Sequence, residues 1–255
     1  MNLDELLEHL GRQVGNAVAF YWSTRSSQAR SQQDRGITDQ GTRAAVTGGA
    51  QMNGFLDIIA HGLRTIGIPQ DCIHFHQRLE LPGYFRATKM WDLLVVKDGQ
   101  LILALEAKSQ VGSFGNNFNN RTEEAMGSAL DLWTAFREGA FRNSTAPWLG
   151  YLFMLQDCPA SRSTVRSKEP HFPVFPEFKG TSYAVRYELF CRKLVRERHY
   201  SASAYLLSSA DTGLQGEYAE PAARSHHAPF SPQPSFPCLR VCPPVGAAST
   251  TARSA

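Results

Sequence analysis

The sequence has no long apolar run: nowhere do about 18 apolar residues follow one another, the length that a membrane-spanning helix requires. The first residues, 1–5, are acidic and do not resemble the basic start of a secretory signal peptide. Cysteine is scarce too, with 5 in 255 residues and no Cys-x-x-Cys pair. These absences argue against a disulfide framework and a zinc site, and they predict a cytoplasmic protein with reduced thiols.

A strong charge of either sign is also lacking. The formal net charge is +3, and 19% of the residues are charged. This balance permits a nucleic-acid partner without indicating one, so a basic surface would have to be local. The 42% hydrophobic content is ordinary for a globular protein, and 255 residues suffice for one sizeable α/β core.

The densest apolar segment has the pattern of a β-hairpin. Two runs, 91–97 and 100–108, flank the dipeptide Asp98-Gly99. Asp-Gly between β-prone runs is a strong hairpin signal, because glycine tolerates the positive φ that tight primed turns require. Runs this apolar are typical of central strands that are covered on both faces.

Charged residues interrupt this pattern at one end of the hairpin. Antiparallel pairing brings Asp92, near the start of the first strand, beside Glu106, near the end of the second. Lys108 follows two residues after Glu106 and therefore shares its face. Two adjacent carboxylates favour a hard cation such as Mg²⁺, and an ammonium beside it can position a water or stabilise charge on a phosphate. We therefore expect phosphodiester hydrolysis.

The alternative interpretation is a surface hairpin whose end charges are solvated, because so short a motif often matches by chance. The chain even contains a second match, Asp157 followed by Glu177-Phe178-Lys179. That second match lies in the proline-rich stretch 170–177, which cannot form a central strand because proline lacks a ladder donor. The strand context favours the first match.

Apolar periodicity also predicts the elements around the hairpin. Before it we expect a helix over 3–21, a polar loop over 23–42, a helix over 52–66, a half-buried strand over 73–80 and a loop over 81–89. After it we expect a loop over 110–121, a helix capped by Thr122, a strand over 148–155, a long loop over 156–182, a helix over 183–200 and a short helix through 204–207. The inner face of the helix after Thr122 is expected to carry Met126, Ala129, Leu130, Trp133 and Phe136.

This order of elements resembles the αβββαβ core of the PD-(D/E)XK nucleases, with Trp91 where the name of that family has proline. Several segments are similar to those of XhoI-type restriction endonucleases: 81–89, 91–93, 115–124, 157–160 and 168–172. The resemblance implies an α/β restriction-endonuclease-like fold with a central mixed sheet flanked by helices, and extra N- and C-terminal helices. Residues 1–220 would form a single nuclease domain.

The resemblance also implies an activity. A type II restriction endonuclease of this family would use Mg²⁺ to cut double-stranded DNA at a short palindrome, 5'-CTCGAG-3', and would leave 5'-phosphates. A palindromic site implies a homodimer with two-fold symmetry, and a cognate DNA methyltransferase would be its genetic partner. Two other functions stay open: a repair or recombination nuclease on the same core, and a DNA-binding protein without catalysis.

The resemblance assigns roles to the residues of the hairpin. Asp92, Glu106 and Lys108 would be catalytic, and the metal ligands would be Asp92, Glu106 and the carbonyl of Ala107. Arg86 and Lys89 come just before Asp92 and are expected to bind neighbouring phosphates.

Further residues are candidates for DNA contact and for an extra acid. The predicted loop after the hairpin contains Asn116, Asn117, Asn119, Asn120 and Arg121. Asn can pair with adenine and Arg with guanine, although Asn and Gly are also common in plain turns. Glu80 and Asp57 are candidates for an additional carboxylate near the metal.

The composition changes after Glu220. Residues 221–255 are rich in proline and contain no Asp, Glu or Lys. Such a segment cannot bury enough apolar surface to fold by itself, so we expect either a disordered tail or the product of a frameshift.

Overall fold

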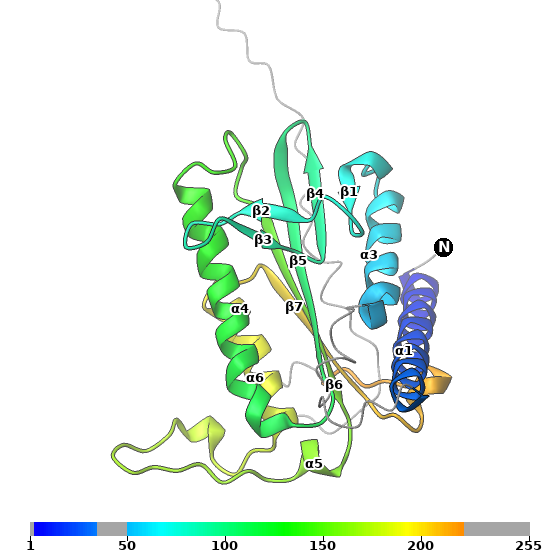
Figure 1. Cartoon of the computed structure of the whole chain (residues 1–255), viewed down its shortest axis with the longest axis vertical. Helices are drawn as coiled ribbons and strands as arrows, with labels where there is room; N and C mark the ends of the chain where they lie inside the picture. The colour runs from blue at the N-terminus through cyan, green and yellow to red at the C-terminus, as the bar shows by residue number, and fades with distance from the viewer. Residues whose placement is uncertain (1–2, 35–49, 222–255) are drawn as a thin grey trace, which may run out of the picture.

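The computed structural model describes residues 3–34 and 50–221 (Figure 1). The predicted tail, except its first residue, and residues 35–42 of the predicted polar loop lie outside the described residues. No helix within the described ranges is both long and apolar enough to cross a membrane.

A five-stranded mixed sheet forms the centre of the fold, in the order β1-β4-β5-β6-β7. Its strands are β1 (Ile73–His74), β4 (Leu93–Lys97), β5 (Gln100–Gln110), β6 (Trp148–Gln156) and β7 (Ala202–Ser208). β1, β4 and β5 pair in antiparallel fashion, and β5, β6 and β7 are parallel. A separate two-stranded ribbon consists of β2 (Glu80–Pro82) and β3 (Thr88–Met90).

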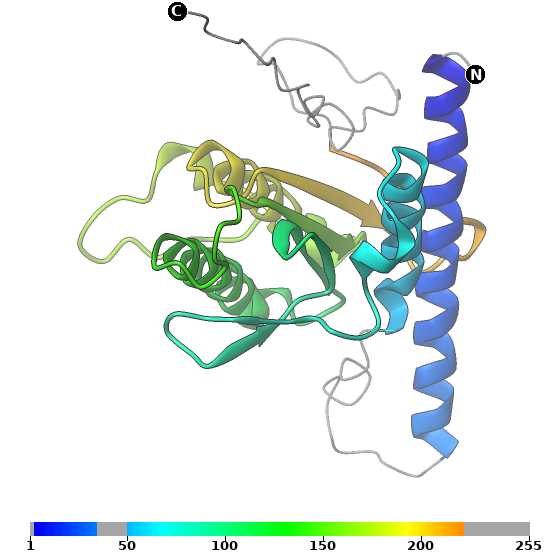
Figure 2. The same cartoon turned by 90° about the horizontal axis from the view of Figure 1, so that it is seen from above.

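Helices cover both faces of the sheet (Figure 2). One face packs against α1 (Leu3–Asp34) and α3 (Asn53–Thr65), in a cluster that includes Val18, Phe55 and Leu105. The other face packs against α4 (Phe114–Arg137) and α6 (Tyr183–Arg196), in a cluster that includes Ala129 and Leu194. The remaining elements are short: η1 (Ala50–Met52), η2 (Gln70–Cys72), α5 (Pro159–Arg162), η3 (Pro176–Phe178) and η4 (Gly213–Gln215). The predicted α/β class with a mixed central sheet is thus confirmed.

The predicted hairpin between β4 and β5 is confirmed as well. Lys97 and Gln100 are paired across the turn. Asp98 has a φ of 52° and Gly99 a φ of 73°, so both turn residues adopt the positive φ of a type I′ turn.

The prediction of a loop from residue 23 was wrong for residues 23–34, where α1 continues to Asp34. The buried aromatic side chains of Tyr21 and Trp22 anchor the middle of this helix to the sheet. Beyond them the hydroxyl of Ser27 donates to the Ser23 carbonyl, four residues earlier in the helix. A helix with one anchored half can therefore continue through a polar segment that shows no apolar period.

The loop predicted over 110–121 was also wrong in its second half, because α4 begins at Phe114. Phe114 is buried and anchors the first turn, and the hydroxyl of Thr122 donates to the Phe118 carbonyl inside the helix, so Thr122 is not a cap.

The inner face of α4 differs from the prediction. The exposed fractions of Met126 and Leu130 are 42% and 52%. Ala129 is buried as predicted, and Trp133 and Phe136 are partly buried against the core. Ala125 and Ala135 are buried as well, and these small residues bring the helix close to the sheet.

Three further predictions need correction. The short helix predicted through 204–207 is the strand β7, which pairs in parallel with β6; periodicity cannot separate a strand from a helix in so short an apolar run. The strand predicted over 73–80 is only the two residues of β1. The loop predicted over 81–89 contains the ribbon of β2 and β3.

Candidate active site

Asp92 lies immediately before β4, beside the second half of β5, as the hairpin predicts. Its backbone N–H donates to the Leu105 carbonyl at 3.1 Å. Its side-chain Oδ2 accepts from the backbone N–H of Ala107 at 2.7 Å. The hydrogen bonds that end the β-ladder therefore also fix the position of the Asp92 carboxylate.

Glu106 points from β5 toward α4 and is almost fully buried, with 3% of its side chain exposed. Its Oε1 lies 3.1 Å from the Nζ of Lys108 and 3.1 Å from the Nζ of Lys89. Lys108 also lies 3.8 Å from Asp92 Oδ2. The structure thus brings the three predicted catalytic side chains together.

The carboxylates and lysines of this site stabilise each other's charged forms. Burial alone would raise the pKa of the Glu106 carboxyl, but the Lys108 and Lys89 ammonium groups outweigh it and hold the pKa below its ordinary value. Burial likewise tends to lower the pKa of Lys108, but Glu106 and Asp92 raise it overall. At neutral pH the carboxylate is therefore ionised and Lys108 is protonated.

A tyrosine completes the surroundings of Glu106. The hydroxyl of Tyr200 lies 3.0 Å from Glu106 Oε2 and 3.0 Å from the carbonyl of Ala125 in α4. Burial raises the pKa of Tyr200 well above its ordinary value, so the group is a neutral donor. Sequence reasoning missed this residue, because no local pattern links it to a strand 94 positions away.

The donor atoms at the site fit Mg²⁺. Asp92, with 36% of its side chain exposed, and Glu106 provide carboxylate oxygens. The backbone N–H of Ala107 points toward Asp92, just before β4 begins. In a strand the carbonyl of a residue points to the same side as its N–H, so the Ala107 carbonyl also points toward the side of Asp92. Within the described ranges, no group of three or more His, Cys, Asp or Glu side chains could hold a metal. A hard cation that takes one or two carboxylates and keeps several waters suits this set; zinc does not.

Arg86 and Lys89 lie on and beside the ribbon of β2 and β3, and both are held by carboxylates. Lys89 pairs with Glu106, whereas the Nε of Arg86 lies 2.7 Å from Asp131 Oδ2 in α4. The Oδ1 of Asp131 also accepts the backbone N–H groups of Tyr84 and Phe85, at 2.7 and 2.8 Å. Asp131, which sequence reasoning also missed, therefore fastens the tip of the ribbon to α4.

The asparagine-rich segment is helical. Asn116, Asn119 and Asn120 are exposed on the first turns of α4, and Asn117 donates to the carbonyl of Ser113. Arg121 is mostly covered and lies 2.7 Å from Glu124. The three exposed side chains thus form one polar helix face directly after β5.

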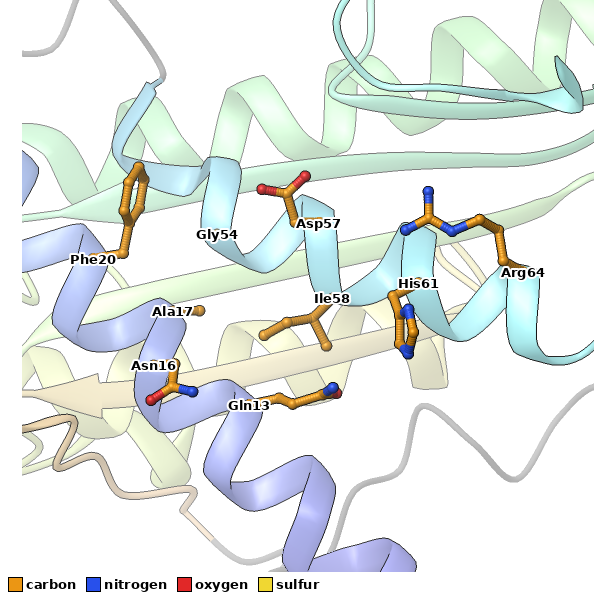
Figure 3. A pocket seen from close by; sticks show the side chains of 9 residues that line it. All are labelled: Gln13, Asn16, Ala17, Phe20, Gly54, Asp57, Ile58, His61 and Arg64. Atoms are coloured by element: carbon orange, nitrogen blue, oxygen red, sulfur yellow. The ribbon is translucent and has the colours of Figure 1, made fainter. Parts of the chain in front are cut away.

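Neither candidate for an extra acid reaches Glu106. Glu80 is paired with Met90 in the ribbon, so it points away from the side on which Lys89 meets Glu106. Asp57 lies on α3, across the sheet, in a surface hollow that it shares with Gln13 and Arg64 (Figure 3).

The second sequence match does not form a site. Glu177 pairs with Lys193 at 2.7 Å, and Asp157 pairs with Arg162 at 2.6 Å. These two ion pairs are separate, and neither acid lies on a central strand.

Comparisons with known proteins consistently match one family of enzymes. The family model described as restriction endonuclease XhoI matches residues 31–220. The type II restriction enzyme BstVI of Geobacillus stearothermophilus is 58% identical over 190 residues, which cover 72% of this chain and 85% of that enzyme. The type II restriction enzyme XhoI of Xanthomonas vasicola is 49% identical over 181 residues, 70% of this chain and 72% of that enzyme. AbrI of Azospirillum brasilense, also a type II restriction enzyme, is 47% identical over 163 residues, 63% of this chain and 73% of that enzyme. No solved structure matches significantly.

The contacts of Asp131 predict a large effect on stability. Replacing Asp131 by Ala removes the acceptor for three donors, and we expect a loss of about 2–3 kcal/mol in the free energy of unfolding at pH 7. Urea denaturation measures the loss, and Glu123→Ala on the exposed face of the same helix is the control.

The effect of Asp131 should also depend on pH. Burial raises the pKa of Asp131, but the Phe85 N–H, Arg86 and the Tyr84 N–H outweigh it, so the folded pKa lies below the ordinary value. The stabilisation is therefore complete above the unfolded pKa, near 4, and disappears as the pH falls through the folded pKa. A difference between wild type and Asp131→Ala that grew on acidification would contradict this assignment.

Proposed function

The chain belongs to the XhoI family of restriction endonucleases, and on this basis we propose that Asp92, Glu106 and Lys108 form its catalytic centre. The family makes the chain an endonuclease with DNA as its substrate. The observation that carries the residue assignment is the buried Glu106 carboxylate on a central strand, with Lys108 and Asp92 beside it.

We propose Mg²⁺ as the cofactor, held by Asp92, Glu106 and the carbonyl of Ala107. When bound, such an ion neutralises charge on the phosphate and lowers the pKa of a coordinated water. Lys108, with 28% of its side chain exposed, orients the attacking water and offers its positive charge to the phosphate. The water oxygen attacks phosphorus and gives up one proton to solvent, the bond from phosphorus to the 3'-oxygen breaks, and that oxygen takes up one proton from solvent. The products are a 5'-phosphate and a 3'-hydroxyl.

The proposed recognition site is the palindrome 5'-CTCGAG-3'. A palindrome is read most simply by a homodimer that places one active site on each strand. A DNA methyltransferase that protects the same sequence is the expected genetic partner.

The exposed asparagines of α4 are the proposed base-contacting residues. Asn116, Asn119 and Asn120 project from one helix face, and a helix fits the major groove, where Asn pairs with adenine in two hydrogen bonds. Asn117 and Arg121, which have partners within α4 and its cap, are assigned to backbone contact instead. Arg86, with 47% of its side chain exposed, and Lys89 are proposed to bind phosphates near the cut.

Asp92→Ala is expected to abolish cleavage but to leave DNA binding within about threefold, because it removes a metal ligand that lies outside the core. The measurement is digestion of a plasmid with one CTCGAG site in Mg²⁺, together with a gel-shift assay on an oligonucleotide. Asp157→Ala, which alters the second sequence match, is the matched control and should still cut. Cleavage by Asp92→Ala would refute the assignment.

The same assays on the wild type separate the alternative functions. Nicking without sequence preference would indicate a repair nuclease. DNA that is retarded in the gel but not cut would indicate a DNA-binding protein without catalysis.

Asn119→Ala and Asn120→Ala, tested separately, should show which asparagine reads a base. Loss of a bidentate contact to adenine costs about 1–3 kcal/mol in discrimination. We therefore expect the variant of the base-reading residue to bind the cognate duplex about tenfold more weakly, with unchanged binding to unrelated DNA. Met126→Ala, further along the same helix, is the control. Equal losses on cognate and unrelated DNA would assign the residue to backbone contact.

A further inference from the structure

We infer that Tyr200 is a positioning residue for catalysis: its hydroxyl holds Glu106 from inside the protein, so that the other carboxylate oxygen faces Asp92 and Lys108. This inference rests on the proposed role of Glu106. Tyr200 itself would not touch the metal or the DNA, because only 1% of it is exposed.

The two oxygens of Glu106 have different partners. Oε2 lies 3.0 Å from the hydroxyl of Tyr200, on the side of the protein interior. Oε1 lies 3.1 Å from Lys108, which is itself 3.8 Å from Asp92. The terminal torsion of a glutamate is broad, so without a donor on one oxygen the carboxylate could turn. The Tyr200 hydroxyl selects one orientation.

The Tyr200 hydroxyl has a single proton, and it donates this proton in a hydrogen bond to Glu106. The other nearby acceptor, the carbonyl of Ala125, lies in the interior of α4 and already receives an intrahelical hydrogen bond. A carboxylate is also the stronger acceptor, because a hydrogen bond to an ionised group is roughly twice as strong as a neutral one.

The fold holds Tyr200 rigidly at this place. α6 ends at Arg196, the chain turns at Arg198 with a φ of 60°, and the backbone N–H of Tyr200 donates to the carbonyl of Leu194. The next residue, Ser201, donates its backbone N–H to Leu149 at the start of β6. The ring of Tyr200 packs 5.2 Å from that of Tyr151. A side chain fixed at both its backbone and its ring can impose an orientation on its partner.

Other buried tyrosines supply matched controls. The hydroxyls of Tyr151 and Tyr187 have no hydrogen-bond partner among the described residues, so removing either hydroxyl tests burial alone. The hydroxyl of Tyr205 donates to the Ala184 carbonyl at 2.9 Å, away from the carboxylates. Tyr205→Phe therefore removes a structural hydrogen bond of similar length without altering Glu106.

The test is the metal affinity of Tyr200→Phe, which keeps the ring in the core. Mn²⁺ binding is measured by electron paramagnetic resonance on the full chain, bound to a duplex with a non-cleavable phosphate analogue. Loss of an outer partner of a metal ligand weakens metal binding by roughly tenfold, so we expect that shift for Tyr200→Phe and none for Tyr205→Phe. The cleavage rate of Tyr200→Phe should also recover as the metal concentration is raised.

The outcomes separate this inference from the proposed function. Tyr200→Phe is expected to lose more thermal stability than Tyr205→Phe, because its hydroxyl donates to a buried carboxylate and that of Tyr205 to a neutral carbonyl, so Mn²⁺ affinity decides between the outcomes and stability does not. An Mn²⁺ affinity of Tyr200→Phe equal to that of Tyr205→Phe would overturn the positioning role, while loss of binding in Asp92→Ala would still support the metal site. Unchanged Mn²⁺ binding in Asp92→Ala would overturn both the positioning role of Tyr200 and the proposed metal site. If Tyr200→Phe does not fold, Tyr200→Met, an apolar side chain without a donor, repeats the comparison, and Mn²⁺ binding as tight as in Tyr205→Phe would again refute the role.

Discussion

The buried carboxylate of Glu106 is the constraint on which the rest of the site depends. A carboxylate with 3% of its side chain exposed stays ionised only if cations and donors surround it. The protein provides two lysines on one oxygen and a tyrosine hydroxyl on the other. These partners come from three separate parts of the chain: the ribbon, β5 and the segment after α6. The geometry of the proposed catalytic site and the packing of the domain are therefore determined together.

α4 links these parts. Its small inner residues let it lie close to the sheet, and the Ala125 carbonyl meets the hydroxyl of Tyr200 there. Further along, Asp131 holds the tip of the ribbon that carries Lys89. The first turns of the same helix expose the asparagines. α4 therefore contacts the surroundings of Glu106 in two places, at the ribbon and at Tyr200.

The hairpin that carries Asp92 and Glu106 could be predicted from the sequence because its turn and its apolar runs are local signals. The Asp-Gly turn pairs Lys97 with Gln100, and an irregularity between Val95 and Val96 shifts the register by one residue, so that Asp92 comes beside Glu106 and Ala107. Tyr200 and Asp131 could not be predicted in this way. Each reaches its partners across at least 45 residues, and the contacts depend on how a helix packs on the sheet.

The errors at the ends of helices have the same physical origin. α1 extends through the polar segment 23–34, and α4 through 114–121, where the only apolar side chains are Phe114 and Phe118 at helical spacing. In α4 the helix continues because Phe114 is anchored in the core at its first turn. The error has a functional consequence, since a flexible loop would present its asparagines in many orientations. A helix anchored at Phe114 presents them in one orientation, next to the strand that carries Glu106, so the proposed base-contacting side chains and the proposed catalytic carboxylate belong to the same rigid unit.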